Sequence, residues 1–415
     1  MSMSVLDRNN LIMLLPWLAF ASLISILPLA FIYEKGGRVI FYYCAYFSLA
    51  GLAVDFYRKK KVLLTDRKAL TMLMLGIMFI GWSIYAKYLH GEKGELYFTA
   101  GKRCVLAFII MTYIFHIYHE KYINKSFLIK CCTVSLALAF VTSSSFALFQ
   151  ALTSADRIVL GINRATLTAY AYSAVTLALI ALILKMHDGK YKKLYFLIVS
   201  IMSLYVILLT QTRSAMVIHS LFLAYMTFRL FAVTRSIKFI SVVAVLMLVA
   251  AGAGYKLIEK RLDLTLHEYQ AYEKGNDRTS LGSRFTMWKT GALSFENAPL
   301  GQAQVERNKF IKSYLDAHNN KNSLALFYMN VHLHNEFIQY ASLFGVVGVL
   351  VLLYFFYVFI VSELILKRTL TPIAAAGIAI LLYGMTDVVL TSIEFIVIFS
   401  VLVVLLTLKE KNDAL

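Results

Sequence analysis

The stretch LLTQTRSAMVIHSLF, residues 208–222, decides how the chain folds. It places Arg213 and a few polar neighbours between two apolar runs, 194–210 and 215–233, each long enough to cross a lipid bilayer as a helix. The pattern predicts a helical hairpin whose turn carries a permanent cation at the membrane surface. Such an arginine is either an ordinary boundary residue that reaches for water, or the partner of something negatively charged.

The composition extends this reading to the whole chain. Hydrophobic residues make up 60% of the 415 residues, and the mean hydropathy is +0.70. Apolar stretches recur from end to end without the alternating polarity of barrel strands, which predicts an all-α integral membrane protein. The net charge of +18 has a simple use in such a protein, because lysine and arginine concentrate in cytoplasmic loops. We therefore expect a lipid bilayer, and no nucleic acid, as the partner of these charges.

We predict about twelve membrane-spanning helices with uncertain edges. The first carries Pro16 and Pro28 and is longer than the apolar core of a signal peptide, so we interpret it as a retained span. The predicted spans lie near 11–29, 39–57, 69–89, 104–118, 126–150, 166–186, 194–210, 215–233, 239–257, 335–362, 372–387 and 389–407.

Loop charge supports this topology and orients it. Every second loop is basic, which places both chain ends and these loops in the cytoplasm and Arg213 on the outer side. The basic loops are RKKK at 58–61, HEKYINK at 119–125, KYKK at 190–193, TRSIK at 234–238 and LKR at 366–368. The chain then divides into nine spans in 1–257, one large outer loop at 258–334, and three spans with a cytoplasmic tail in 335–415.

The large loop contains a predicted helix in TSLGSRFTMWKTGALSFENAPLG, residues 279–301. Thr279, Ser280 or Ser283 can cap its start, and Pro299 with Gly301 ends it. A loop of this length is expected to be a small folded element with a function of its own. One face of the helix, expected to lie on the bundle or at the lipid surface, carries Phe285, Trp288, Ala292 and Phe295.

Several cations abut the outer ends of spans, where the positive-inside rule predicts no surplus. They are Lys102, Arg103, Arg157, Arg164 and Arg213. A cluster of cations at an outer mouth suits a polyanionic ligand, because guanidinium offers a planar fork of donors to phosphate oxygens. We expect these residues to meet at one place.

No motif in the chain indicates a nucleotide or a metal. The sequence lacks GxxxxGK[ST], GxGxxG after a strand, HExxH and GxSxG. The four cysteines (Cys44, Cys104, Cys131 and Cys132) lie in or beside apolar runs and suggest neither disulfides nor a zinc site. We expect no cofactor and no metal.

A second candidate constellation is VHLHNEFIQYASLFG, residues 331–345. On a helix, His332 and His334 would diverge by about 200°, which argues against a shared metal. A single imidazole beside Asn335 and Glu336 can act as a base, or it can be a capping or interfacial histidine. Two carboxylates, Asp387 and Glu394, fall in or beside the last spans. We expect each to pair with an arginine, with a direct catalytic role as the less favoured alternative.

Four motifs occur in a fixed order along the chain: TQTRSAM, SRFTMW, APLGQ and HLHNEF. Together with the predicted topology they resemble the O-antigen ligases of Gram-negative bacteria, within the wider ligase and polymerase superfamily. The resemblance covers nearly the whole chain. Carried over by motif, Arg213 and Arg284 match the family's essential arginines and His334 its essential histidine. Asp387 matches less closely.

The resemblance implies a glycosyltransferase-C type fold in the bacterial inner membrane with a periplasmic active site. It also implies transfer of O-antigen polysaccharide from undecaprenyl pyrophosphate to an outer-core sugar of lipid A–core, with inversion and without metal. Arg213 and Arg284, together with Lys102, Arg103, Arg164 and Asp387, are the expected substrate-binding residues. Two alternatives stay open: an O-antigen polymerase with the same donor, and a flippase or transporter of lipid-linked glycans. The spacing from arginine to loop to histidine favours the ligase.

Overall fold

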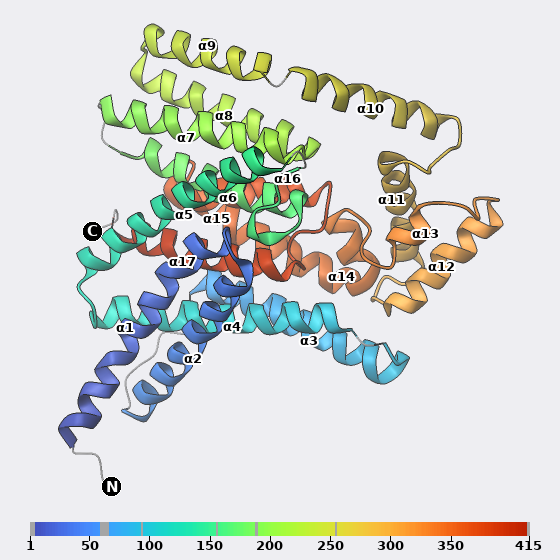
Figure 1. Ribbon diagram of the computed structural model, residues 1–415. Helices are drawn as coiled ribbons and strands as arrows, with labels where there is room; N and C mark the ends of the chain where they lie inside the picture. Colours follow the sequence, from blue (N-terminus) through green and yellow to red (C-terminus); the bar gives the residue numbers. More distant parts are fainter. Residues whose placement is uncertain are drawn as a thin grey trace.

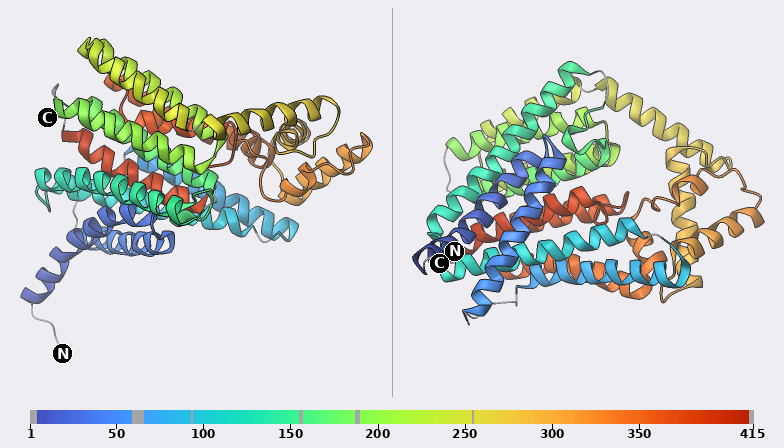
Figure 2. Two further views of the ribbon diagram at one scale, coloured as in Figure 1. Left: turned by 45° about the horizontal axis from the view of Figure 1, so that its top comes forward. Right: turned by 60° about the horizontal axis from the view of Figure 1, so that its bottom comes forward.

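The computed structural model describes residues 5–58, 66–92, 94–154, 157–186, 190–253 and 255–412. Every regular element in these ranges is a helix, as the sequence predicts. The long helices run side by side as a bundle, and the helices of the large loop gather at one end of it (Figures 1 and 2). The start of α1 and the end of α17 lie at the opposite end (Figure 2).

Each predicted span coincides with a helix of the bundle. These helices are α1 (Val5–Ala30), α2 (Glu34–Tyr57), α3 (Arg67–His90), α4 (Glu95–Glu120), α5 (Lys125–Thr153), α6 (Ala165–Leu184), α7 (Lys190–Thr210), α8 (Arg213–Thr234), α9 (Ile237–Ala253), α14 (Glu336–Phe356) continuing through a π-helical turn into α15 (Ser362–Lys367), α16 (Pro372–Gly384) and α17 (Ile393–Asn412). Within the described residues, eight helices are long and apolar enough to cross a membrane, which fits an integral membrane protein. The full number of crossings stays a prediction.

Ion pairs hold helix ends together at one end of the bundle. Lys68 binds Glu363 at 2.7 Å, and Lys185 binds Glu410 at 3.3 Å, so the ends of α3, α6, α15 and α17 meet there. At the other end of α3, the indole N–H of Trp82 donates to the carbonyl of Gln302 in the large loop. Of the basic stretch at 58–61, only Arg58 lies within the described residues.

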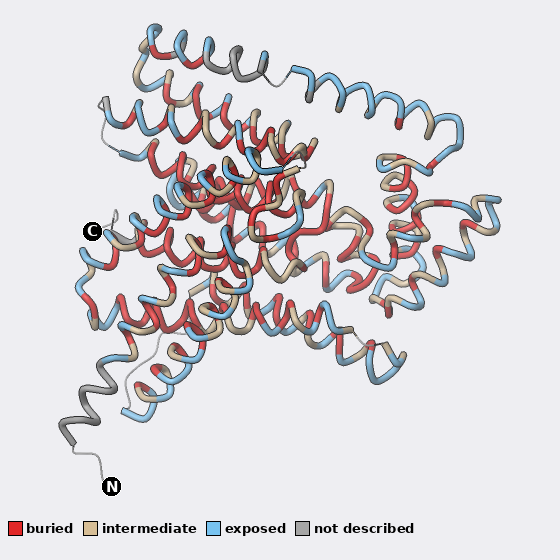
Figure 3. The backbone as a smooth tube through the Cα atoms, viewed as in Figure 1, coloured by how far each residue is buried: buried red, intermediate tan, exposed pale blue. Residues whose placement is uncertain are grey.

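Helix α6 forms the centre of the bundle. It is apolar all round, and nearly all of its residues are buried by α16, α7 and α8 (Figure 3). A helix that is hydrophobic on every side needs such an enclosed position. Two of its polar residues, Thr166 and Tyr170, reach the candidate site described below, and the Tyr170 hydroxyl is hydrogen-bonded to Ser214.

The large loop is a helical unit with a small apolar core of its own. It consists of α10 (Tyr255–Glu273), α11 (Ser280–Asn297), α12 (Gln304–Ala317) and α13 (Ala325–Tyr328). The core residues are Met287, Ile311, Leu315, Ala325, Met329 and Leu333. The boundary expected between 257 and 258 falls inside α10, because that helix begins at Tyr255 directly after α9.

The predicted helix α11 begins and ends where the sequence indicates. The Thr279 hydroxyl accepts from the backbone N–H of Gly282 at 3.0 Å, and the helix stops at Asn297. The buried face, however, is the one with small residues, whereas Phe285 and Trp288 are only half-buried. The aromatic face is therefore not the most closely packed one, and its place on the bundle or at the lipid surface stays a prediction. Gly291 explains the close packing of the small face: a Cβ there would come within 2.7 Å of Leu333 and closer still to Ile338, so glycine lets α11 approach the start of α14.

Helix α14 is broken at Gly345, where φ is 63° and ψ is −152°. The APLGQ turn fills the break. Its Pro299 carbonyl accepts from the backbone N–H of Val346 at 2.9 Å, and the Gln302 N–H donates to Leu343 at 2.9 Å. Backbone groups freed inside an apolar bundle need such partners, so the turn anchors the large loop to α14.

We expect Gly345→Ala to lower the stability of the protein by about 1–3 kcal/mol, because a side chain at positive φ is strained. The added Cβ would also overlap the 299–301 turn. The measurement is thermal denaturation of the purified protein in detergent. Gly81→Ala in α3 is the matched control, since nothing lies within 4 Å of its added Cβ. Equal melting temperatures for the two variants would contradict this account of the break.

Candidate active site

A cavity of about 890 Å³ lies where the bundle meets the large loop. The end of α7, the first turns of α8 and α11, and part of α10 line it. Four of its lining residues are arginines: Arg157, Arg213, Arg261 and Arg284. None of the described residues that line it is acidic, and further along α8 the wall is mostly apolar. The cavity thus joins a cationic end to an apolar wall.

Arg213 is the first residue of α8 and faces this cavity. Its guanidinium binds both carboxylate oxygens of Glu268, at 2.9 Å and 3.1 Å, and the hydroxyl of Thr265 at 2.9 Å. These bonds engage three of the five N–H groups of a guanidinium, which leaves two for a ligand. Arg213 is therefore fixed in place before any anion arrives.

Glu268 of α10 connects three helices. It is only 6% exposed, and besides Arg213 of α8 it accepts from the backbone N–H of Leu281 in the first turn of α11, at 3.1 Å. A buried carboxylate needs such partners, and here they belong to separate parts of the fold. One side chain therefore joins the bundle to the loop helices.

Two further arginines brace the turn between α7 and α8. Arg157 donates to the Thr210 carbonyl at 2.8 Å and to the Thr212 hydroxyl at 3.0 Å, and Arg261 donates to the Gln211 side chain at 2.9 Å. Burial, with the positive charges of Arg261 and Arg213, holds the pKa of Arg157 below its ordinary value. Crowded, partly desolvated cations of this kind favour a bound anion.

Arg284 of α11 lines the same cavity, so the structure brings the two predicted arginines into one hollow. No described residue accepts a hydrogen bond from the Arg284 side chain, in contrast to Arg213. Its charge acts on both His332 and Asp387. Arg284 therefore stands between the cavity and the histidine cluster.

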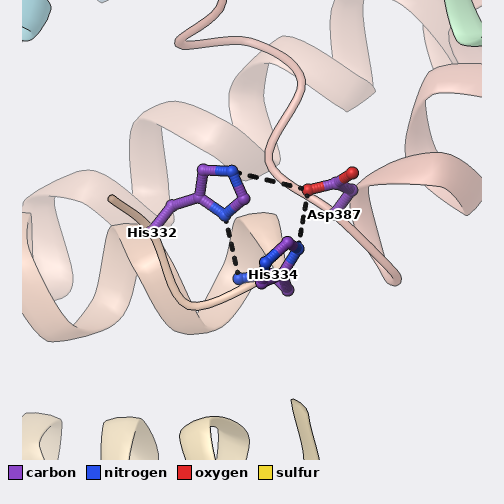
Figure 4. Close-up of side chains that lie close together, drawn as sticks. All are labelled: His332, His334 and Asp387. Atoms are coloured by element: carbon purple, nitrogen blue, oxygen red, sulfur yellow. Dashed lines mark hydrogen bonds and ion pairs between the residues drawn. The ribbon is translucent and has the colours of Figure 1, made fainter. Parts of the chain in front are cut away.

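His332, His334 and Asp387 form a compact cluster (Figure 4). The Nδ1 atom of His334 lies 3.1 Å from the Asp387 carboxylate, and Nε2 of His332 lies 3.8 Å from it. The two imidazole rings are only 4.2 Å apart, so the expectation that they diverge is wrong. Its premise was a helix, but this segment lies between α13 and α14, and the positive φ of 51° at His334 turns the chain.

The backbone around the cluster is held by hydrogen bonds from several elements. Trp288 of α11 donates its indole N–H to the His334 carbonyl at 3.0 Å. Asn335 caps α14 and donates to the Met385 carbonyl at 2.9 Å. Glu336, fully buried, accepts from two N–H groups just after Asp387, those of Val389 and Leu390. These hydrogen bonds hold the backbone on both sides of the cluster and so fix the His334 ring and the Asp387 carboxylate in position.

Both expected pairings of a carboxylate with an arginine are wrong. Asp387 was expected to pair with an arginine, but it lies in the loop after α16 and binds His334 instead. Glu394 accepts from the Ser392 hydroxyl in the first turn of α17, at 2.9 Å. The histidine of another loop takes the place of the expected arginine at Asp387, and a serine two residues earlier in the chain does so at Glu394.

Hydrogen bonding defines the protonation of the cluster. The backbone N–H of His334 donates to Nδ1 of His332, so the proton of neutral His332 lies on Nε2, directed at Asp387. If a metal bound to Nε2, the proton of neutral His332 would have to move to Nδ1. The backbone N–H of His334 would then lose its acceptor. His334 donates Nδ1–H to the carboxylate and keeps Nε2 as a free acceptor. The three residues could hold a cation by distance alone, but these bonds favour a histidine–carboxylate pair.

The charges of the cluster follow from its surroundings. Burial by itself raises the pKa of Asp387, but the hydrogen bond from His334 and the charges of both histidines and Arg284 outweigh it, so the pKa lies below its usual range. Burial, together with His334, Arg284 and Arg164, lowers the pKa of His332 to about 4 against the opposing charge of Asp387. At neutral pH the cluster therefore contains a carboxylate and an uncharged His332.

The remaining outer cations do not all gather at the cavity. Arg164 is exposed at the start of α6 and acts on His332 through its charge, without lining the cavity. Lys102 lies 5.2 Å from the Phe98 ring, and Arg103 is only 2% exposed. The expectation of a single meeting place is wrong for Arg164, Lys102 and Arg103, since none of them lines the cavity. Helix α4 begins at Glu95 and places Lys102 and Arg103 inside the helix.

Sequence reasoning missed Arg261 and Glu268, and it noted Arg157 as an outer cation without choosing it. Arg261 lies in an ordinary stretch of alternating charges, KLIEKRLDLTLHE, residues 256–268. Nothing there distinguishes it from a solvated helix cation. Only the packing of α10 against the start of α8 gives these residues a role.

The fold and cavity define a helical membrane-type protein with a cationic site beneath a helical loop. Residues 197–353, from α7 to α14, match the family described as O-antigen ligase. Over 283 residues the chain is 26% identical to the O-antigen ligase of Escherichia coli (strain K12), covering 67% of this chain and 66% of that relative. The resemblance drawn from the motifs is thereby confirmed over these ranges, while its extension to nearly the whole chain stays a prediction. The matched segment contains Arg213, Arg284 and His334.

We expect Glu268→Ala to destabilise the protein by about 1–3 kcal/mol, since breaking a buried ion pair is costly but water can partly solvate the remaining guanidinium. Arg213 is 29% exposed in its side chain, which is the reason for this discount. The measurement is thermal melting in detergent. Glu259→Ala on the same helix, where the side chain is exposed, serves as control. Similar melting of both variants would show that Glu268 does not join the helices.

Proposed function

We propose that this protein is an O-antigen ligase of the glycosyltransferase-C type. It transfers O-antigen polysaccharide from undecaprenyl pyrophosphate to an outer-core sugar of lipid A–core, in the biosynthesis of lipopolysaccharide. One observation carries the proposal: the cavity has four arginines and, among its described lining residues, no acidic one, and it lies at the end of an apolar wall beside a histidine–carboxylate pair. The family match supports the same assignment.

The cavity suits both parts of the donor substrate, the pyrophosphate and the polyprenyl chain. A lipid pyrophosphate is a good leaving group if the negative charge that grows on it is stabilised, and preplaced guanidiniums supply this stabilisation electrostatically. The first turns of α8 and α11 also line the cavity, and helix N-termini favour anions. The apolar wall along α8, with Met216, Val217 and Leu221, offers the polyprenyl chain a surface inside the bilayer.

The histidine cluster suits the acceptor. A sugar hydroxyl is a poor nucleophile and benefits from a base within hydrogen-bond reach. Nε2 of His334 is free to take its proton, while Asp387 holds the ring and stabilises the positive charge that forms. In one displacement the acceptor oxygen bonds to the anomeric carbon, the bond from that carbon to the pyrophosphate oxygen breaks, and the electron pair leaves with the pyrophosphate. Attack opposite the leaving group inverts the anomeric carbon.

The location follows from the substrates. The polyprenyl and lipid A chains stay in the inner membrane, and the glycan headgroups react at the periplasmic mouth of a multi-pass protein. The helices of the large loop then cover the mouth and orient two bulky glycolipids. Arg213 and Arg284 are the proposed residues that bind the pyrophosphate of the donor, and Asp387 is the proposed partner of the base His334. Lys102 and Arg103 do not line the cavity.

We expect His334→Ala to lower kcat by about 10²–10⁴-fold, since it removes the base. Arg284→Ala should lower it by about 10²–10³-fold through loss of leaving-group stabilisation. Asp387→Asn should also be impaired, because an amide can donate to Nδ1 and favour the wrong tautomer. The assay is transfer of O-antigen from purified undecaprenyl-pyrophosphate donor to lipid A–core by the purified enzyme. Lys102→Ala is the control with expected wild-type activity.

Deletion in a host that makes O-antigen distinguishes this reaction from polymerisation. Loss of a ligase leaves bare core, whereas loss of a polymerase leaves core that carries one repeat unit. Core capped with a single unit in the deletion strain would rule out the ligase, and normal lipopolysaccharide ladders from His334→Ala would rule out the base.

We expect the reaction to be independent of metal ions. Guanidiniums occupy the place that a cation would take at the pyrophosphate, and the backbone bond to His332 opposes metal binding in the cluster. The measurement is the initial rate before and after treatment with EDTA, followed by metal analysis of the protein. A rate lost on chelation and restored by one divalent metal would contradict this expectation.

A further inference from the structure

A second hollow, of about 500 Å³, lies on the other side of α11, between the end of α10, α11 and α12. We propose that it is a carbohydrate-binding subsite that holds a glycan part of one of the two substrates. This inference rests on the proposed function for its source of sugar, but the chemistry of the hollow is independent of the first cavity. Its lining is aromatic and mixed in charge, where the first cavity is cationic and apolar.

The aromatic side chains form the surfaces that a sugar ring prefers. One face of a pyranose carries C–H groups and packs against an aromatic ring, while the hydroxyls at its rim need donors and acceptors. Tyr269 is 46% exposed at the hollow, and Tyr314 is half-buried with His318 stacked on it at 4.1 Å. The rings of Tyr272 and Phe285 lie 5.2 Å apart along the same hollow.

The polar groups of the hollow suit hydroxyls and do not suit a diphosphate. Lys289 is the single lysine or arginine among the described lining residues, and Glu273 offsets its charge. Asp277 is already engaged, because it accepts hydrogen bonds from Thr286, Asn320 and Ser323. Asn320 donates an N–H of its side-chain amide to Asp277, and its amide oxygen is available as an acceptor. The hollow therefore offers acceptors and one ammonium donor around aromatic surfaces.

A row of aromatic rings connects this hollow to the proposed base. Phe285 lines the hollow and lies 5.7 Å from Trp288, and Trp288 donates to the His334 carbonyl. Arg284, the residue directly before Phe285 in the chain, lines the first cavity. Helix α11 thus separates a site for the diphosphate from a site for sugar, and a glycan held in the hollow extends along it toward His334.

Two substrates carry sugars, the donor polysaccharide and the core oligosaccharide of the acceptor, and kinetics separate them. We choose Tyr269→Ala, which changes an exposed residue, and Tyr314→Leu, which keeps apolar packing against the core of the loop but removes the ring. Tyr255→Ala is the control, an exposed tyrosine 14 residues earlier on α10. We expect the double variant, which carries both site substitutions, to raise the KM of one substrate by about tenfold, the combined scale of two lost aromatic surfaces, with kcat unchanged.

The substrate whose KM rises identifies the glycan. A higher KM for lipid A–core alone assigns the hollow to the acceptor, and a higher KM for the donor that grows with the number of repeat units assigns it to the polysaccharide. Unchanged KM values for both substrates, or the same change in Tyr255→Ala, would overturn the proposal.

Direct binding keeps the test independent of catalysis. Saturation-transfer NMR is measured on the full chain in lipid nanodiscs, with lipid-free core oligosaccharide and lipid-free O-antigen fragments as probes. We expect transfer to one probe in the wild type and its loss in the double variant. No transfer to either probe, or equal transfer in the variant, would refute the subsite. Binding without any glycosyl transfer by the wild type would refute the proposed function and leave the subsite intact.

Discussion

The bidentate ion pair between Arg213 and Glu268 is the interaction on which the candidate site depends. An arginine at the start of an apolar helix is costly unless its charge is met, and a buried carboxylate is costly for the same reason. Each satisfies the other, and the same carboxylate holds the first turn of α11, which carries Arg284. The pair therefore sets the distance between the two predicted arginines, although neither arginine contacts the other directly.

The large loop has a second attachment at the break in α14. There the APLGQ turn supplies backbone partners that the broken helix lacks, and Gln302 also accepts the indole N–H of Trp82 on its carbonyl. One attachment positions the cavity and the other positions the segment that leads to His334. A loop held at both places is a fixed wall of the site, so its own hollow on the far side of α11 keeps a constant relation to the histidine cluster.

Long apolar stretches predict the helices of the bundle well, because a bilayer imposes length and polarity on each segment locally. The start of α11 was predictable for a similar local reason, the cap at Thr279. The site was only partly predictable. Arg213 stands out because its surroundings are apolar, but Glu268 and Arg261 gain their roles from pairings across 50 residues or more, with no local signal. The histidine pair was misjudged because a left-handed residue, His334, replaced the assumed helix.

The charges of the histidine cluster explain why two imidazoles beside several arginines can still serve one base. Burial is the main reason that the pKa of His332 falls to about 4, and the positive charges of Arg284 and Arg164 lower it further against the opposing charge of Asp387. His332 then remains neutral at physiological pH, with its Nε2 atom 3.8 Å from the carboxylate, and Asp387 keeps its hydrogen bond with His334 at 3.1 Å. If His332 were charged, it would compete for that carboxylate and weaken the stabilisation of a protonated His334. Burial is therefore what mainly keeps the second histidine neutral, and Arg284, which lines the cavity, contributes to both sites through its charge.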